Sequence, residues 1–223
     1  MKKTWKILLI TLGCFSALFA SGATYFAVVT KDAALDPKKL VLSDDKVEIF
    51  DADDGIVKNA SAFSPRETFR LETLPDKAKF AFVDTEDKRF YDHGGFDYKR
   101  MVKATLKNVR TRSFKEGAST ISQQLIKNIT GEKDFSVERK IKEIFRALSL
   151  EKSNSKDQIM EAYLNSIHLG WNTDGVQAAA NLYFGKDVSQ LSIAESAALI
   201  AITQNPSKRE LFNHEENNRE RRE

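Results

Sequence analysis

Apolar residues recur every three or four positions along most of the chain beyond Pro75, which is the spacing of one face of an α-helix. Ser136 precedes one such series, whose apolar members are Val137, Ile141, Ile144, Phe145 and Leu148. The pattern predicts amphipathic helices packed around one core, and the first of them begins near Pro75. The expected fold class is mainly α.

Helix-capping signals precede the later series. Ser155 with Gln158, and Ser192 with Glu195, have the spacing of a capping box, in which two side chains satisfy the free amides of a helix N-terminus. The second pair opens an alanine-rich run that ends before Pro206. We therefore expect helices to begin directly after both serines.

The N-terminal region has a different pattern. Residues 7–29 carry no acidic or basic side chain, and 23 helical residues of about 1.5 Å rise cross a hydrocarbon core of roughly 30 Å. We expect a retained transmembrane helix here. A cleaved signal peptide is the alternative, because residues 20–23 are small. The lysines within residues 1–6 place that tail in the cytoplasm, so the rest of the chain is expected on the outer face of the membrane.

Residues 30–74 are expected to form a stalk between this span and the first helix. Val47–Phe50 and Ile56–Val57 flank the turn sequence Asp53-Asp54-Gly55, which predicts a short β-hairpin. Residues 75–223 are then expected to form a single domain, because 223 residues suffice for one domain plus an anchor.

Charge and cysteine content narrow the function classes. The 35 Lys and Arg residues nearly balance the 32 Asp and Glu residues, and Lys2, Lys3 and Lys6 account for the net excess of +3. No broad positive surface is therefore expected beyond the N-terminus, which argues against nucleic acid as a partner. Cys14 is the only cysteine, so no internal disulfide is possible and the redox compartment is not readable.

The first cluster of candidate chemistry covers residues 86–97. Glu86 and Asp87 lie where the first helix gives way to the glycine turn Gly94-Gly95. A carboxylate placed where a helix ends beside irregular backbone can be positioned as a general base. A solvated helix end is the alternative interpretation.

The second cluster covers residues 117–128. Helical spacing places Thr120, Gln124 and Lys127 on one face, and an apolar stripe lies on another. A glycine-led helix N-terminus followed by a lysine can hold phosphate, although the Gly-Lys-Ser/Thr of a phosphate loop is missing. The alternative is an ordinary surface helix capped by Thr120 and Gln123, which leaves the polar stripe unexplained.

The third cluster covers residues 139–146, in which Arg139, Glu143 and Arg146 share a face opposite the apolar one. Taken alone, it is typical of a surface ladder of ion pairs that contributes a few tenths of a kcal/mol per pair.

These three clusters, followed by residues 156–165 and 175–186, resemble the motifs of family 51 glycosyltransferases in their order and spacing. That family comprises the monofunctional peptidoglycan glycosyltransferases and the N-terminal domains of class A penicillin-binding proteins. The resemblance covers roughly residues 44–207. It implies a lysozyme-like helical domain with a smaller lobe that faces the membrane.

The resemblance also implies roles for individual residues. Glu86 matches the catalytic base, and Glu143, which matches the second family carboxylate, is expected to be catalytic as well. Residues that shape the site or contact the substrate are expected at Asp87, Phe90, His93, Thr120, Gln124 and Asn128, and the cations near the donor pyrophosphate are expected at Lys127, Arg139 and Lys140.

The implied reaction is an inverting transfer that polymerises a lipid-linked disaccharide, lipid II, into β-1,4 glycan strands and releases undecaprenyl diphosphate. No nucleotide sugar is needed. The resemblance also implies a divalent cation such as Mg²⁺ at the pyrophosphate, although the sequence shows no dedicated ligand set for it. The implied partners are the growing lipid-linked chain, the bacterial cytoplasmic membrane, and proteins of cell-wall synthesis and division.

Residues 110–116 interleave cations with one aromatic side chain. Arg112 and Lys115 are expected to rest on anionic headgroups and Phe114 to insert as a shallow anchor. A solvated loop has the same composition and remains the alternative.

Two other functions fit parts of the pattern. A lysozyme-like hydrolase of glycan strands also uses two carboxylates, and a membrane-tethered scaffold would need no chemistry at all. Residues 213–223 are almost wholly charged or polar, so they are either disordered or the start of another helix. The chain is accordingly interpreted either as a fragment of a longer protein or as a complete enzyme with a reduced last helix.

Overall fold

A computed structural model describes residues 16–17, 19–31, 33, 68–112, 117–132, 134 and 136–222. Its helices are α2 (Asp76–Glu86), α3 (Tyr98–Thr111), α4 (Ile121–Thr130), α5 (Val137–Ser153), α6 (Lys156–Leu164), α7 (Val176–Phe184), α8 (Ile193–Thr203), α9 (Pro206–Arg209) and α10 (Glu215–Arg222), with 3-10 turns at Leu71–Thr73, Phe90–Asp92 and Val188–Gln190. Over these residues no strand forms, and one isolated antiparallel bridge joins His168 to Asp174. The mainly α class is confirmed.

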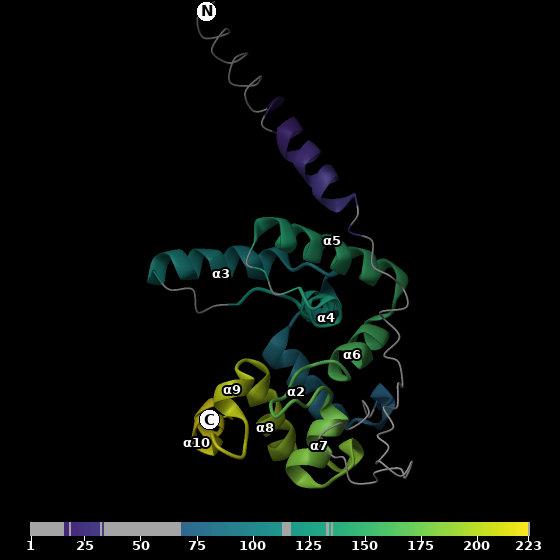
Figure 1. Cartoon of the computed structure of the whole chain (residues 1–223), viewed down its shortest axis with the longest axis vertical. Coiled ribbons are helices and arrows are strands. Elements are labelled where there is room, and N and C mark those ends of the chain that lie inside the picture. The colour runs from purple at the N-terminus through teal and green to yellow at the C-terminus, as the bar shows by residue number, and fades with distance from the viewer. Residues whose placement is uncertain are drawn as a thin grey trace, which may run out of the picture.

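One hydrophobic core holds the helices together, as the periodicity predicted. Helix α4 packs against α5 and α6, while α2 packs against α8. Figure 1 shows α3 and α5 lying across one end of the molecule, with α7, α8 and α9 toward the other end. Phe82, Leu125, Ile159, Tyr163 and Leu199 are fully buried at the centre. Burial of side chains of this size supplies the main favourable free energy of folding.

The predicted caps are confirmed. The hydroxyl of Ser136 accepts a hydrogen bond from the amide of Arg139 at the start of α5. Both capping boxes form, because the Ser155 and Ser192 side chains accept from the third helical residue and that residue's side chain accepts from the cap's own amide. These contacts are local, which is why the sequence predicts them.

Helix α2 begins after Pro75, as expected, and a contact from α6 fixes the segment that leads into it. The side-chain amide of Asn165 donates to the carbonyl of Phe69 at 2.9 Å and accepts from the amide of Phe69 at 3.0 Å. All of these atoms are buried, so the pair replaces the hydrogen bonds that a strand partner would supply.

The polar C-terminal segment is ordered as α10, so the helical alternative holds for residues 215–222. This helix packs on α8 and α9 although it has no apolar stripe. Asn218 is fully buried, and its amide nitrogen donates to the carbonyls of Ala198 and Arg209 at 2.9 and 2.8 Å. A polar contact in the core therefore holds a helix that hydrophobic patterning alone does not place.

The N-terminal helix, residues 19–30, projects from the end of the molecule that carries α3 and α5 (Figure 1). Phe26 contacts the ring of Phe145 edge-on, and the guanidinium of Arg146 donates to the carbonyl of Ala33. Within the described part of the chain, no helix has both the length and the apolar character needed to cross a membrane. Residues 7–15 and 18 of the predicted span lie outside the described residues, and so does the predicted hairpin within residues 34–67.

Candidate active site

Glu86 is the last residue of α2, and two hydrogen bonds fix its carboxylate. Gln124 of α4 donates its amide nitrogen to Oε2 at 3.2 Å, and Thr203 of α8 donates its hydroxyl to Oε1 at 2.5 Å. The residue is 8% exposed. Each carboxylate oxygen has a second lone pair, so both donors can remain in place while a third group binds.

Tyr163 fixes the orientation of the Gln124 side-chain amide. The hydroxyl of Tyr163 in α6 donates to Oε1 of the Gln124 amide at 3.2 Å, which leaves the amide nitrogen to face Glu86. Burial, and then the negative charges of Glu86 and Asp87, raise the pKa of Tyr163 well above its ordinary value. Tyr163 therefore keeps its proton and remains a donor at physiological pH.

Asp87 joins the end of α2 to the start of α4. Its Oδ2 accepts from the backbone amide of Ile121 at 3.1 Å and from Nε2 of His93 at 2.8 Å. The amide of Gly95 donates to Nδ1 of His93 at 3.2 Å, so Nε2 is the ring nitrogen that carries the proton toward Asp87. Asp87 is fully buried and thus acts within the protein rather than on its surface.

The remaining predicted residues of the first two clusters fall into two groups. Phe90 and Thr120 are fully buried, and the Thr120 hydroxyl caps α4 and donates to the carbonyl of Gly95 at 2.8 Å. Lys127 and Asn128 are exposed on α4. Lys127 lies one turn beyond Gln124 and so shares the helix face that points toward Glu86.

The third cluster forms a buried ion-pair group around Glu143. Arg139 pairs with Oε2 of Glu143 at 2.5 Å, and Lys140 pairs with Oε1. Lys140 also donates to the hydroxyl of Ser119 and to the side-chain carbonyl of Gln123. Neighbouring glutamines of α4 thereby link the two carboxylates, since Gln124 contacts Glu86 while Gln123 contacts the cation that Glu143 binds.

Two buried donors in this group have no protein acceptor. They are Nε2 of Gln123 and Nε of Arg139. A buried N–H without an acceptor costs free energy, and such donors commonly face a ligand or water. Both donors belong to the group of side chains that also contains Lys140 and Glu143.

Two contacts at the site were not anticipated from the sequence. Thr203 reaches Glu86 from 117 positions along the chain. Lys156 donates to the carbonyl of His93 at 2.6 Å and lies 4.3 Å from the centre of the Phe90 ring. Lys156 is the first residue of segment 156–165, which resembles a family motif, and this position could have indicated a role at the site. Nothing in the sequence near Thr203 indicates a contact with Glu86.

Helix α3 carries an exposed apolar face that the sequence analysis also missed. The face consists of Tyr98, Met101, Val102, Leu106 and Val109, whose helical spacing was the available signal. Of the expected membrane-contact residues, Arg112 ends α3 in the left-handed conformation, while Phe114 and Lys115 lie outside the described residues.

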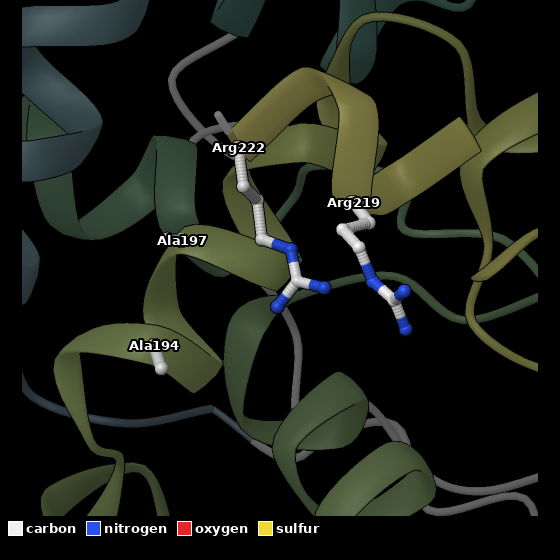
Figure 2. A pocket seen from close by; sticks show the side chains of 4 residues that line it. All are labelled: Ala194, Ala197, Arg219 and Arg222. Carbon is white, nitrogen blue, oxygen red and sulfur yellow. The ribbon is translucent and has the colours of Figure 1, made fainter. Parts of the chain in front are cut away.

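A pocket of about 370 Å³ lies at the other end of the molecule, between α8 and α10. Figure 2 shows its lining residues, Ala194 and Ala197 from α8 with Arg219 and Arg222 from α10. None of the predicted site residues lines this pocket. It is separate from the group of side chains around Glu86.

Comparison with known proteins shows the family to which the chain belongs. The family model described as Transglycosylase matches residues 54–223. Penicillin-binding protein 1A of Clostridium tetani is 36% identical over 205 residues, which cover 90% of this chain and 26% of that protein. Penicillin-binding protein 1F of Bacillus subtilis is 36% identical over 218 residues, which cover 97% of this chain and 30% of that protein.

Penicillin-binding protein 1A of Aquifex aeolicus is 37% identical over 219 residues, which cover 97% of this chain and 30% of that protein. The chain therefore spans less than a third of the length of these three relatives. The family match extends over more than half of the chain and includes every predicted site residue. The chain belongs to the transglycosylase family.

Proposed function

We propose that this chain polymerises lipid II into β-1,4 glycan strands on the outer face of the bacterial cytoplasmic membrane. One observation carries the proposal: Glu86 is nearly buried at the end of α2, and donors from α4 and α8 orient its carboxylate. A carboxylate held in this way can accept a proton from a sugar hydroxyl at a defined position.

The chemistry assigned to Glu86 is general base catalysis. Glu86 takes the proton of the acceptor 4-hydroxyl while that oxygen bonds to the anomeric carbon of the lipid-linked donor. The bond from that carbon to the pyrophosphate breaks at the same time, and its electron pair leaves with undecaprenyl diphosphate. Attack opposite the leaving group inverts the α-linked donor to a β-1,4 product.

Cations assist the departure of the pyrophosphate. Lys127, Arg139 and Lys140 supply positive charge, and the buried N–H groups of Gln123 and Arg139 supply free donors. Fixed donors and cations stabilise the charge that develops on a leaving group. In this scheme Glu143 orders two of the cations and does not act on the sugar.

A divalent cation such as Mg²⁺ is a further candidate ligand at the pyrophosphate. The described residues contain no group of three or more His, Cys, Asp or Glu side chains placed to hold a metal ion. Cation binding there would rely mainly on the pyrophosphate oxygens of the substrate.

The exposed apolar face of α3 supports contact with the membrane surface. This helix lies at the same end of the molecule as the N-terminal helix (Figure 1). Lysines and arginines border the apolar face, which is the composition of helices that lie in a lipid interface. We extend the contact to Arg112, Phe114 and Lys115, and assign residues 7–29 as the anchor, with residues 1–6 in the cytoplasm.

This placement also divides the domain in two. Helices α3 and α5 would belong to the smaller lobe that faces the membrane, and the helices around α2 and α8 to the lysozyme-like lobe. Lipid II would then reach Glu86 from the membrane side, and cell-wall synthesis and division proteins would meet the outward surfaces.

The deciding experiment incubates the detergent-solubilised chain with lipid II and compares it with Glu86→Gln. The wild type should produce long glycan polymer, and the variant should be slower by about 100-fold or more, because general base catalysis contributes that much. Polymer formation by Glu86→Gln at the wild-type rate would remove Glu86 from the mechanism.

The same assay separates the alternatives. Shortened strands from preformed cell wall, without polymer from lipid II, would indicate a hydrolase. A hydrolase of this kind would need Glu143 as its second catalytic carboxylate. Both Glu143 oxygens are paired with cations, which argues against that role. A scaffold would show neither reaction.

A further inference from the structure

The hydroxyl of Thr203 lies between two acceptors. Its oxygen is 2.5 Å from Oε1 of Glu86 and 2.7 Å from the carbonyl oxygen of Ile200 in the same helix. A hydroxyl has one proton and can donate to only one of them at a time. The Ile200 carbonyl belongs to the last turn of α8, where carbonyls lose their regular helical partners.

We propose that Thr203 is a positioning residue that serves both protonation states of Glu86. The proposal rests on the function proposed above, in which Glu86 alternates between carboxylate and carboxylic acid. With Glu86 ionised, the Thr203 hydroxyl donates to Oε1. After Glu86 has taken the acceptor's proton, the carboxyl O–H donates to Oγ1 of Thr203, whose own proton rotates to the Ile200 carbonyl.

Of the described side chains that contact the Glu86 carboxylate, Thr203 is the one that can make this exchange. Gln124 faces Oε2 with its N–H group, and Tyr163 holds that amide in one orientation. A fixed N–H donor cannot accept a proton, so protonation of Glu86 is directed to Oε1. Thr203 is the group that contacts Oε1 and can both donate and accept.

Two charged groups near Glu86, Asp87 and Arg100, are bound to atoms other than its carboxylate oxygens. Asp87, the next residue, is held by His93 and by the amide of Ile121. Arg100 from α3 donates to the backbone carbonyl of Glu86 and not to its carboxylate. Asp87 and Arg100 therefore make no contact with the Glu86 carboxylate.

Removal of the hydroxyl weakens the carboxylate form more than the acid form, because a hydrogen bond to a charged acceptor is stronger than one between neutral groups. The acidic limb of the pH–rate profile should consequently move to higher pH. Thr203→Val preserves the side-chain volume and removes the oxygen. Thr203→Ser preserves the oxygen.

The test measures initial rates of polymer formation from lipid II by the full chain between about pH 5 and pH 9. In Thr203→Val, kcat should fall by about tenfold with KM nearly unchanged, and the acidic limb should shift upward by about half to one pH unit. Thr203→Ser should keep the wild-type limb. Thermal unfolding of each variant checks that it folds.

If valine at this position disturbs folding, Thr203→Ala is compared with Thr203→Ser instead. These two side chains differ by one oxygen, so the comparison still isolates the hydroxyl. An acidic limb of Thr203→Ala that coincides with those of Thr203→Ser and the wild type would overturn the role of the hydroxyl. A wrong proposed function would give a different result, because the wild type itself would form no polymer at any pH. That result would overturn the role of Thr203 as well.

Discussion

Gly95 lies directly against the backbone of Ala147 in α5, so that a β-carbon built at position 95 would come within 2.6 Å of the Ala147 carbonyl oxygen. Gly95 also has a φ of +91°, a conformation that side chains disfavour. Within the loop after α2, the Gly95 amide donates to His93, and the Gly95 carbonyl accepts from Thr120, which joins the first cluster to the second.

Gly95→Ala should lower the free energy of unfolding by about 3 kcal/mol, because it combines backbone strain with a clash against main-chain atoms. Urea unfolding followed by circular dichroism measures the loss. Gly94→Ala is the matched control, since a β-carbon there has nothing within 4 Å. Equal stability of the two variants would mean that the loop does not sit against α5.

Glu143→Gln should be destabilising by about 2 kcal/mol, since it leaves Arg139 and Lys140 without their buried counter-charge. The value lies below that of a fully enclosed pair because the Lys140 side chain is 39% exposed. Glu138→Gln, in the same helix, breaks an exposed pair with Lys142 and should change stability by less than about 0.5 kcal/mol. If Glu143→Gln and Glu138→Gln unfolded at the same urea concentration, the structural role of Glu143 would be wrong.

The pH dependence of stability should reveal the charge at the start of α8. Hydrogen bonds from the Lys186 ammonium and then from Ser192 lower the pKa of Glu195 to about 2. A carboxyl with a depressed pKa stabilises the fold above its unfolded pKa of about 4.3, and this stabilisation disappears as the pH falls toward the folded pKa.

Glu195→Gln should therefore cost about 1 kcal/mol at pH 7, a value reduced for solvent screening of a pair near the surface, and nothing near pH 2. Glutamine keeps a cap acceptor and removes only the charge. Glu215→Gln, which breaks an exposed pair with Arg219, should match the wild type throughout. A cost for Glu195→Gln that persists unchanged at low pH would contradict this assignment.

Membrane contact through α3 is testable with a protein that lacks residues 1–30. Leu106 is 66% exposed on the apolar face, and Leu106→Ser should reduce partitioning onto anionic liposomes by about tenfold. Phe114→Ala should weaken partitioning as well. Leu182→Ser on α7 is the control, because Leu182 is 41% exposed at a different part of the surface. Equal losses from Leu106→Ser and Leu182→Ser would argue against a specific lipid-facing surface.

Much of the helical framework could be predicted from the sequence. The starts of α5, α6 and α8 follow Ser136, Ser155 and Ser192, because a cap forms between residues three positions apart. Helix α10 was left open because its stability comes from Asn218, whose partners lie in α8 and α9. The apolar stripe of α3 was present in the sequence, but only the structure shows that no other helix among the described residues covers it.

The sequence predicted which residues belong to the candidate site better than it predicted how they are arranged. The motifs identified Glu86, Gln124 and Glu143. The structure confirms the cap at Thr120, which the sequence offered as the alternative interpretation. It adds that Thr120 is fully buried and that the oxygens of Glu143 are paired with cations. Which donor reaches each oxygen lone pair depends on the groups around it, and those groups come together only when the helices have packed.

By itself, the sequence determined where α2, α5, α6 and α8 begin, which serines cap the last three of them and where the chemical motifs lie, because periodicity and capping act within a few residues. The tertiary structure alone decided that Thr203 meets Glu86 across 117 positions and that Gln124 presents its nitrogen rather than its oxygen. Such contacts arise from the packing of α2, α4, α6 and α8 around one core, where most buried polar atoms find a hydrogen-bond partner.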